Sequence, residues 1–452
     1  MLKDYREIPQ DALYIIDTLE EHGYEAYVVG GCVRDMIMGR IPHDWDITTS
    51  AEPEDVKRVF KRTYDTGIQH GTVTVIVDTE HYEVTTYRIE GEYKDSRRPE
   101  SVSFVEDITL DLSRRDFTMN AIAYHPVRGF VDPYNGRKHI EEGCIKSVRD
   151  AKERFTEDAL RILRAVRFSA QLGFSIAPHT IEGIKACKHL LANISKERIR
   201  DEFLKICMSD TPEAIDTLKE LGLLEYIIPE FLKTYETPQN HPHHIYGVAE
   251  HTLVAMKHSP KDQVIRLAVL LHDIGKPLTR TTDAKGIDHF YNHPQKSAEI
   301  AKDVLKDLRL DNQTIKEVTL LVSLHDYHLR KHISKFYLKE ILKVTGEVLF
   351  DKLLIINEVD AKAQNPDKYL MKQQTIESIR ALKTEIVEGH ECYNLKMLKV
   401  NGGDLIKLGV QPGKAVGDLL EHLLTYVMKH PEANTKEALE AYIKDGCHSN
   451  NH

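Results

Sequence analysis

The sequence predicts a small mixed α/β domain followed by a long all-helical region. Short strand-type apolar runs, separated by glycines and turn residues, are concentrated in the first 145 of the 452 residues. Beyond that point, apolar residues recur at helical spacing almost throughout. A chain of this length is too long for a single compact core, so two to four packed units are expected.

Composition and charge limit the classes of protein that the chain can form. Hydrophobic residues make up 41% and charged residues 29%, which is ordinary for a soluble globular protein. No apolar run approaches the roughly 18 residues of a membrane span, and the N-terminus has no apolar signal-peptide core. These observations predict a cytoplasmic protein without a membrane partner. The six cysteines form no CxxC pair and are expected to be reduced.

A net charge of −10 argues only weakly against a nucleic-acid partner, because binding depends on local patches. Residues 151–207 carry eleven Lys and Arg against seven Asp and Glu, a local balance of +4. The acidic excess therefore lies elsewhere, and the basic middle of the chain permits an RNA partner.

The elements of the α/β part follow from periodicity and glycine stops. Residues 10–22 are amphipathic and end at Gly23, which predicts a helix. Residues 24–29 are expected to form a strand that a glycine pair ends. The further expected elements are a short helix over 32–38, a strand over 44–48, a helix over 53–62, and strands over 72–77 and 82–89.

The helical region has its clearest predicted helix over residues 155–172, and a histidine-rich stretch at 240–244 marks a boundary. Glycine turns at 402–403 and 409–413 characterise a last unit. The predicted parts are an α/β head over 1–145, an all-α neck and body over 146–235, a helical bundle over 236–390 and an α-helical tail over 391–452.

A glycine pair and two aspartates form the first candidate site. Gly30 and Gly31 stand between a predicted strand and helix, where backbone N–H groups are able to approach a polyphosphate. In a strand, Asp44 and Asp46 point to the same side, and paired carboxylates suit Mg²⁺. Taken singly, a tight turn and a solvated strand edge are the alternatives. The ordered combination, with an Arg-Asp pair between, is far more specific.

Residues 30–49 resemble the first motif of the class II tRNA nucleotidyltransferase and bacterial poly(A) polymerase family, which belongs to the polymerase-β-like superfamily. The resemblance implies a polymerase-β-like nucleotidyltransferase head in which Asp44 and Asp46 hold two Mg²⁺ ions. One ion activates the RNA 3′-hydroxyl and the other accompanies the triphosphate. The family's third carboxylate comes from a later strand, for which Glu83 is the candidate. The nucleotide contacts expected in this motif are Gly30, Gly31 and Arg34.

The resemblance extends to two further motifs. Residues 113–121 match the family's second motif, which implies ribose and phosphate contacts from Arg115, Asp116 and Asn120. A carboxylate and an amide are able to hydrogen-bond ribose hydroxyls and so select a ribonucleotide. An Arg-Arg-Asp run by itself would be a surface ion pair. Residues 132–136 are similar to the third motif, a turn expected to act as a hinge between head and neck.

Residues 157–168 match the family's most diagnostic motif. At about 100° per residue, Glu157, Asp158, Arg161 and Arg164 fall within an arc of roughly 120° on a helix. A solvated salt-bridged face is the alternative. The resemblance implies that Asp158 and Arg161 act as a protein template, with Arg164 also in the nucleotide site. A carboxylate accepts from the exocyclic amine of C or A and a guanidinium donates to ring acceptors, whereas U and G present a carbonyl instead.

A second constellation lies in the helical region. His251, the adjacent His272 and Asp273, and Asp360 fall in three predicted helical segments, an arrangement able to ligate a divalent metal inside a bundle. Together with His293, the pattern resembles the HD phosphohydrolase superfamily. This resemblance implies a metal-dependent phosphohydrolase and leaves the identity of the metal open. An inactive HD bundle kept as structure is the alternative.

The remaining motifs concern RNA. Residues 194–202 are similar to the family's last motif, in which Glu197 and Arg198 are expected to brace the neck helices. Residues 395–446 resemble the tail that grips the tRNA elbow, although ordinary loop punctuation also explains their glycines. The loop over 90–102 is uninterrupted, whereas CC-adding relatives typically have it shortened. Its presence favours complete CCA addition.

Together the motifs predict an enzyme that adds C, C and A to the 3′ end of tRNA from CTP and ATP without a nucleic-acid template. The expected cofactors are Mg²⁺ in the head and a divalent metal in the HD bundle. The alternatives are an A-adding or poly(A) polymerase of the same family, a nucleotide phosphohydrolase whose head senses nucleotides, and a non-catalytic RNA-binding protein. The paired carboxylates argue against the last two, because neither needs a metal pair. The oligomeric state is not predicted.

Overall fold

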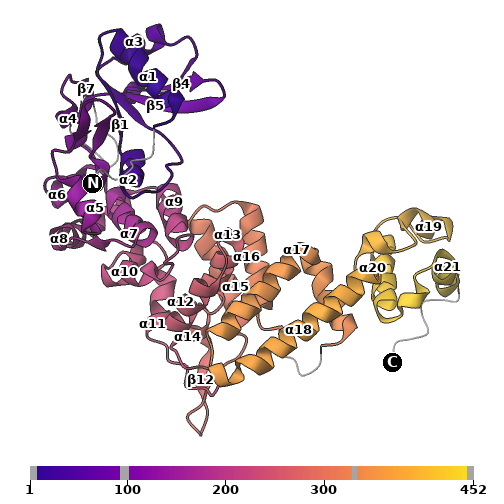
Figure 1. The fold of residues 1–452 in the computed structure, drawn as a ribbon. Helices are drawn as coiled ribbons and strands as arrows, with labels where there is room; N and C mark the ends of the chain where they lie inside the picture. Colours follow the sequence, from indigo (N-terminus) through magenta and orange to yellow (C-terminus); the bar gives the residue numbers. More distant parts are fainter. Residues whose placement is uncertain (1–7, 92–100, 328–332, 445–452) are drawn as a thin grey trace. The chain divides into compact units, whose positions relative to one another are not determined.

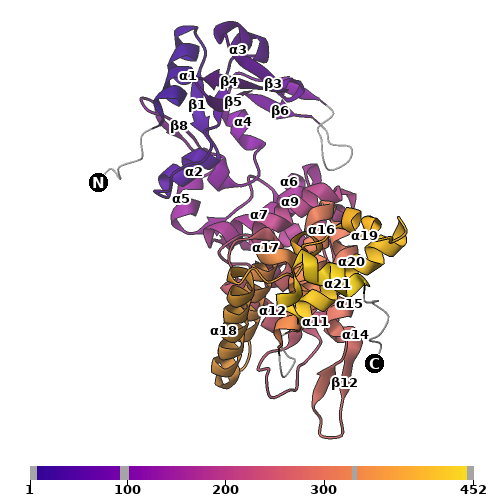
Figure 2. The same ribbon diagram turned by 90° about the vertical axis from the view of Figure 1, so that its right-hand side faces the viewer.

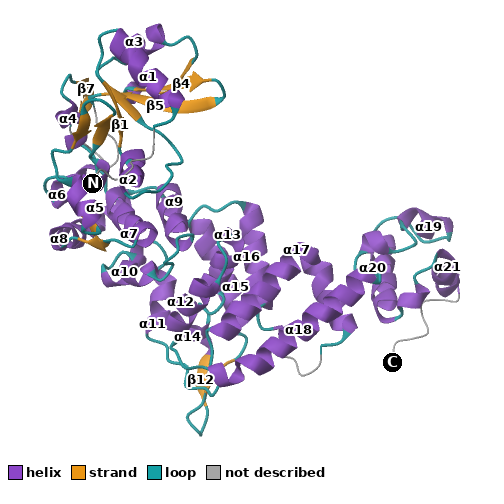
Figure 3. Ribbon diagram, in the orientation of Figure 1, coloured by secondary structure: helices purple, strands orange, loops and turns teal. Residues whose placement is uncertain are grey.

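The computed structural model describes residues 8–91, 101–327 and 333–444. The chain separates into two compact units, one comprising Met1–Leu232 with Asp307–Arg309 and the other Lys233–Lys306 with Leu310–His452. Figure 1 labels their elements in chain order, and Figure 3 shows that nearly all strands belong to the first unit. None of the helices within the described ranges combines the length and the apolar character needed to cross a bilayer.

The head contains the predicted mixed sheet, which has seven strands where four were expected from the strand-type runs. Its order is β3-β4-β5-β2-β1-β8-β9. Only the pair of β2 and β5 is parallel among these neighbours. The strands are β1 (Ala26–Val29), β2 (Ile47–Thr49), β3 (Thr63–Gly67), β4 (Thr72–Val77), β5 (Glu80–Thr86), β8 (Ala123–His125) and β9 (Gly129–Val131). The helices α1 (Gln10–Glu21) and α3 (Pro53–Val59) lie side by side against this sheet (Figure 2).

The predicted strand over 44–48 is shorter than expected. Strand β2 begins only at Ile47, so Asp44 and Asp46 precede it. The carbonyl of Asp46 still accepts a hydrogen bond from the Val29 amide at 3.0 Å, but the ladder to β5 begins at Ile47. The two carboxylates are therefore carried by the loop that enters the sheet.

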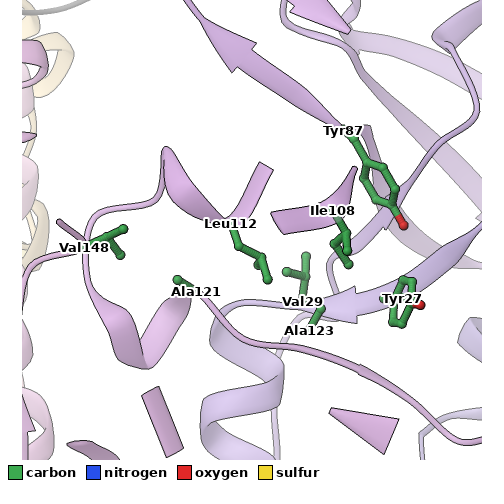
Figure 4. Packing of buried hydrophobic residues seen from close by; sticks show 8 residues of the cluster. All are labelled: Tyr27, Val29, Tyr87, Ile108, Leu112, Ala121, Ala123 and Val148. Carbon is green, nitrogen blue, oxygen red and sulfur yellow. The ribbon is translucent and has the colours of Figure 1, made fainter. Parts of the chain in front are cut away.

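An apolar cluster fixes the elements from which the first site is built. Tyr27 and Val29 of β1 pack with Ile108 and Leu112 of α4 (Ile108–Ser113), and Ala123 of β8 lies beside them (Figure 4). Burying each large aliphatic side chain contributes about 1.5–3 kcal/mol. Because β1 leads directly into the glycine pair and α4 leads into residues 114–116, this core sets the distance between the two motifs.

The second half of the first unit is helical. The predicted helix over 155–172 is wrong as a single element, because the chain breaks at Asp158 (φ −138°, ψ 102°). The Asp158 carboxylate accepts a hydrogen bond from the Leu160 amide at 3.1 Å and so starts the next helix. The helices here are α5 (Gly136–Glu141), α6 (Ala151–Glu157), α7 (Leu160–Leu172), α8 (Pro178–Cys187), α9 (Lys196–Cys207) and α10 (Ala214–Glu220). The short helix α2 (Gly31–Ile37) belongs to the head, and α11 (Leu232–Tyr235) begins at the last residue of the stretch Met1–Leu232.

The second unit is a helical bundle followed by a helical tail segment. Helices α12 (Val248–His258), α13 (Gln263–Leu271), α16 (Asn312–Leu324) and α17 (Lys335–Lys362) pack against one another. A hairpin of β12 (Arg280–Thr282) and β13 (Asp288–Phe290) was not expected. The remaining elements are α14 (Lys276–Thr279), α15 (His293–Asp307), α18 (Pro366–Glu388), α19 (Gly402–Lys407), α20 (Lys414–Lys429) and α21 (Lys436–Lys444). The four-part domain division remains a prediction.

Candidate active sites

A cavity of about 600 Å³ in the first unit brings together residues that are more than a hundred positions apart in the sequence. It joins the glycine turn after β1, the loop before β2, the segment after α4, and helices α7 and α9. The predicted residues that line it are Gly30, Gly31, Arg34, Asp44, Asp46, Arg115, Asp116, Asn120, Asp158, Arg161 and Arg164. The lining residues without a predicted nucleotide contact are Arg114, Leu160, Arg167, Phe168 and Arg198.

The charge of this lining suits a polyphosphate. Seven arginines and four aspartates line the cavity, which gives it a positive balance within a chain of net charge −10. Guanidinium groups donate paired hydrogen bonds to phosphate oxygens, and a concave surface concentrates their field. An anionic substrate is therefore favoured over a neutral one.

Two of the three predicted metal carboxylates, Asp44 and Asp46, line this cavity. Asp44 is exposed and Asp46 half-buried, while Glu83 projects from β5 outside the lining. Burial raises the pKa of the Asp46 carboxyl, and Arg115 lowers it. The charges of Glu83 and Asp44 raise the pKa of Asp46 further, so both carboxylates act on Asp46 electrostatically.

An oxygen-only donor set of this kind fits Mg²⁺, whose binding would relieve the mutual repulsion. The oxygen atoms of Asp44, Asp46 and Glu83 do not all lie within 4.8 Å of one another. Within the described ranges, three ligand atoms lie within 4.8 Å of one another only at two sets in the second unit.

Arg115 is held against the glycine turn by a buried aspartate. Gly30 has φ +82°, and a Cβ there would lie 2.9 Å from Arg115 Nη1. Arg115 donates to Asp111 Oδ2 at 3.3 Å, and Arg114 donates to Asp111 Oδ1 at 2.8 Å. Burial alone would raise the pKa of Asp111, but Arg114 and Arg115 lower it below its usual value. Sequence reasoning missed Asp111, although its i,i+3 and i,i+4 spacing to two arginines was readable.

A chain of hydrogen bonds connects the second motif to α7 and α2. Asp116 Oδ2 accepts from Arg164 at 2.6 Å, and Asp116 Oδ1 accepts from Asn120 Nδ2 at 3.1 Å. Asn120 Oδ1 in turn accepts from Arg34 at 2.8 Å. Burial opposes ionisation of Asp116, but Arg164 and Asn120 lower its pKa to about 2. The carboxylate is therefore charged at neutral pH and fixed in orientation.

The two predicted template residues have separate partners. Arg161 donates to Glu157 Oε2 at 2.7 Å and to the carbonyls of Arg154 and Arg114. Asp158 instead accepts from Arg198 of α9 at 2.9 Å. Arg198, expected to brace the neck, thus lines the cavity beside Asp158. Asp158 also precedes α7, so the single helical face predicted for these charges does not exist.

The aromatic ring of Phe168 forms part of the cavity wall and is surrounded by guanidinium groups. The Arg167 guanidinium lies 4.0 Å from the ring centroid, that of Arg34 5.2 Å and that of Arg164 5.3 Å. Arg167 also pairs with the buried Glu202 at 2.6 Å. Each cation–π contact contributes about 0.5–2 kcal/mol. The ring therefore helps to hold the guanidinium groups of Arg34, Arg164 and Arg167 at the wall of the cavity.

Asp273, His293 and Asp360 of the HD pattern line a second cavity of about 340 Å³ in the bundle, and His251 and His272 contact these aspartates. His251 Nε2 lies 2.9 Å from Asp360 Oδ1, and His272 Nε2 lies 3.2 Å from Asp273 Oδ2. Lys276 Nζ lies 2.7 Å from the same Asp273 oxygen. All of these side chains are buried. Nitrogen and oxygen donors in this combination suit a borderline divalent cation.

Sequence reasoning missed several histidines of this cavity, which are His325, His289 and the stretch of His241, His243 and His244 that was interpreted only as a boundary. His325 follows α16 and lies with His293 beside Asp273. The signal was present, because His325 and Asp326 form a second His-Asp pair at the end of an apolar run. Burial lowers the pKa of His325 to about 4, so this imidazole is neutral at pH 7. A neutral imidazole is the form that binds metals.

The fold and the first cavity define a template-independent nucleotidyltransferase of the polymerase-β-like type. The family model of the poly(A) polymerase head domain matches residues 26–146. A model described as a probable RNA- and SrmB-binding site of polymerase A matches 173–234, and a putative tRNA nucleotidyltransferase domain 2 matches 281–443.

Full-length relatives identify the particular enzyme family. The CCA-adding enzyme of Levilactobacillus brevis is 34% identical, with 95% of this chain and 96% of the relative covered. That of Lactiplantibacillus plantarum is also 34% identical, with 98% of each covered. The crystal structure of the Bacillus stearothermophilus CCA-adding enzyme in complex with CTP superposes with a TM-score of 0.72, at 30% identity over 96% of each chain.

This chain belongs to the class II CCA-adding enzymes, and its activity is the addition of CCA to tRNA. The prediction of CCA addition is thereby confirmed over A-only and poly(A) synthesis. Residues 92–100 of the loop that favoured this prediction lie outside the described residues.

Proposed function

We propose that the first cavity holds incoming CTP or ATP beside the 3′ end of tRNA, and that Asp44, Asp46 and Glu83 bind two Mg²⁺ ions there. The observation that supports this assignment is the charged lining, in which seven arginines accompany the predicted metal carboxylates Asp44 and Asp46. The crystal structure of the similar Bacillus stearothermophilus enzyme is that of its complex with CTP. When bound, the ions supply charge neutralisation for an in-line displacement at phosphorus.

The protein groups position the substrate for this displacement. Arg34 and Arg115, which flank the glycine turn, bind phosphate oxygens, and the fixed Asp116 and Asn120 accept and donate hydrogen bonds at the ribose. The 3′-oxygen of the RNA bonds to the α-phosphorus while the bond to the pyrophosphate oxygen breaks. The hydroxyl proton passes to water and pyrophosphate leaves, still paired with arginines.

Base choice is assigned to Asp158 and Arg161. Asp158 Oδ2 accepts from one guanidinium, so this carboxylate retains lone pairs for the exocyclic amine of C or A. Arg161 is anchored by two carbonyls and a carboxylate, which fixes the orientation of its guanidinium at the cavity. A rigid donor and acceptor pair reads a base edge without a template strand.

The metal assignment is tested by Asp46→Ala. We expect this variant to lose nucleotide addition to tRNA lacking its 3′ end, because a ligand oxygen is removed where the ions neutralise developing charge. Asp65→Ala, which removes an exposed carboxylate of β3, is the matched control and should retain full activity. Normal incorporation of labelled CTP by Asp46→Ala would overturn the assignment.

We further infer that the bundle is a phosphohydrolase in which His251, His272, Asp273 and Asp360 hold a divalent cation. The buried position of these residues and their mutual contacts of 2.9–3.7 Å support the inference. Lys276 and Lys372 line the same cavity and would bind the phosphate of the substrate. The alternative is an inactive bundle kept as structure.

The test of this inference is hydrolysis of phosphoesters, including a 2′,3′-cyclic phosphate end, with added Mn²⁺, Ni²⁺, Co²⁺ or Mg²⁺. His272→Ala should lose any such hydrolysis and retain C and A addition, because the two sites belong to different units. If the wild-type enzyme hydrolyses no phosphoester with any of the four metals, the inference is wrong and the bundle is an inactive one kept as structure.

Partners and location complete the proposal. The tail over 391–452 is assigned to tRNA binding, with Asn401 capping α19 at the glycine turn that resembles the family's tail. A cytoplasmic location follows from substrates that are cytoplasmic molecules: tRNA, CTP and ATP.

A further inference from the structure

Three lysines of helix α17 form a stripe that faces the tail over 391–452. Lys335, Lys339 and Lys343 are spaced four residues apart, so their side chains share one face of the helix. Lysines at this spacing repel one another and destabilise a helix unless acidic groups lie opposite them. The tail supplies an acceptor to each of the three, so the stripe is the surface on which the tail is mounted.

The central lysine of the stripe, Lys339, joins two separate segments of the tail. Its Nζ lies 2.5 Å from Glu391 Oε2 and donates a hydrogen bond to the Met428 carbonyl at 3.1 Å. Glu391 is the first residue of the tail, and Met428 belongs to α20, which packs against α17 (Figure 1). The Lys339 side chain is only 1% exposed, so its ammonium group has lost its water and depends on these two acceptors.

The two outer lysines pair with carboxylates on either side of the central one. Lys335 Nζ lies 2.8 Å from the other oxygen of Glu391 and 2.5 Å from Glu385 of α18. Lys343 Nζ lies 2.6 Å from Glu421 Oε2 of α20. Burial alone would raise the pKa of Glu391, but the lysines beside it lower that pKa below its usual value. The Glu391 carboxylate is therefore charged at neutral pH and lies between two cations.

Helix α17 is divided just beyond the stripe. Gly346 has φ +65° and ψ 179°, a backbone conformation that is essentially restricted to glycine. The part after this break is fixed in the bundle, where Lys352 Nζ lies 2.8 Å from Asp262 Oδ2, and Asp262 caps α13. The part over 335–345 carries the whole stripe. Helix α17 therefore has one half that belongs to the bundle and one half to which the tail is attached.

We propose that Lys339 is a positioning residue for tRNA, which holds the tail in one orientation on α17. The inference rests on the assignment of the tail to tRNA binding. A single tRNA is then bound at two places, with its 3′ end in the first cavity and another part at the tail. The affinity gained from two linked contacts depends on how narrowly their geometry is fixed. A tail that was free to turn on α17 would lose much of this gain, while the chemistry at the 3′ end would be unaffected.

Kinetics with two RNA substrates and amide hydrogen exchange test the proposal on the full-length chain. Lys339→Met removes the charge and keeps an unbranched side chain, and Glu391 keeps Lys335 as its partner. We expect the KM for tRNA lacking its 3′ end to rise roughly tenfold. The KM for CTP and the KM for an acceptor-stem microhelix should stay unchanged, because the microhelix has no part that reaches the tail. Amide exchange should accelerate in α19–α21 but not in α12–α16. An unchanged KM for tRNA, or unchanged exchange in the tail, would overturn the proposal.

Controls separate positioning from misfolding. Lys383→Met is the matched variant, because Lys383 of α18 pairs with Asp351 at 3.0 Å on the bundle side of Gly346. It should leave the KM for tRNA unchanged, and an equal rise in both variants would show a general loosening of α17 and overturn the role of Lys339. Retained CTP incorporation on the microhelix verifies a folded head. If Lys339→Met does not fold, Glu391→Gln, which weakens the same ion pair, replaces it.

The wild-type chain distinguishes a failure of this proposal from a failure of the tail assignment. Bound tRNA should slow amide exchange in α19–α21 of the wild type. If it does not, the tail does not bind tRNA, and both the assignment and the positioning role are wrong. If tRNA does protect the tail, and Lys339→Met still has the wild-type KM for tRNA, only the positioning role is wrong.

Discussion

Replacing Arg161 with alanine tests the protein-template assignment most directly. The residue is only 8% exposed, and its guanidinium makes hydrogen bonds to Glu157 and to the carbonyls of Arg154 and Arg114. Glu157 retains Arg154 as a second cationic partner, so its charge is not stranded in the variant. The expected loss is therefore concentrated in the cavity, at the donor that meets the base.

The magnitude follows from one charge-assisted hydrogen bond. Such a bond contributes about 1.5–3 kcal/mol, which corresponds to roughly a tenfold to hundredfold change in the preference for C and A over U and G. The measurement is single-nucleotide extension of tRNA with each of the four triphosphates, from which the ratios of kcat/KM are compared. Asp44 and Asp46 are untouched, so the variant should still incorporate the wrong nucleotides at a measurable rate.

A parallel variant distinguishes base reading from support. Arg198→Ala removes the partner of Asp158 but leaves Arg161 in place. If Arg198 only orients Asp158, this variant should relax selectivity less than Arg161→Ala does. The reasoning is refuted if Arg161→Ala lowers all four values of kcat/KM by the same factor, because the residue would then be structural.

Two further predictions concern the buried aspartates of the head. Asp111→Asn weakens the charge-assisted hydrogen bonds that hold Arg114 and Arg115, and should raise the KM for CTP roughly tenfold with a smaller change in kcat; an unchanged KM would show that Arg115 is oriented without it. Asp116 has its folded-state pKa depressed from 3.8 to about 2, so its contribution of about 2 kcal/mol is present above pH 4 and lost as the pH falls towards 2. Urea unfolding of the wild type and of Asp116→Asn over this range should converge at the acid end, and a constant gap between them would contradict the assignment.

Features set by local pattern were predictable from the sequence. The run 72–77 alternates in the way of a strand and forms β4 with the predicted bounds, and the glycine pair ends β1 as expected. The motif residues from position 30 to position 164 line one cavity.

Features set by tertiary contact were not predictable in the same way. Nothing in residues 155–172 marks a break, since Asp158 lacks the glycine or proline that usually announces one. Its partner Arg198 lies forty positions further along the chain. The two side chains meet only because α9 packs against α7, which the local sequence does not indicate. The same applies to His325, whose relation to His293 depends on how α15 and α16 enter the bundle.

The helix break at Asp158 limits how the base preference of this enzyme could be redesigned. One oxygen of the side chain caps α7 through the Leu160 amide, and the other accepts from Arg198. A change to lysine or arginine, chosen to attract the carbonyl of U or G, would remove a cap that contributes about 1 kcal/mol and place two cations side by side. Asparagine, serine and threonine retain the capping function. A mutant library at this position is therefore best restricted to side chains that start helices, and varied together with position 198.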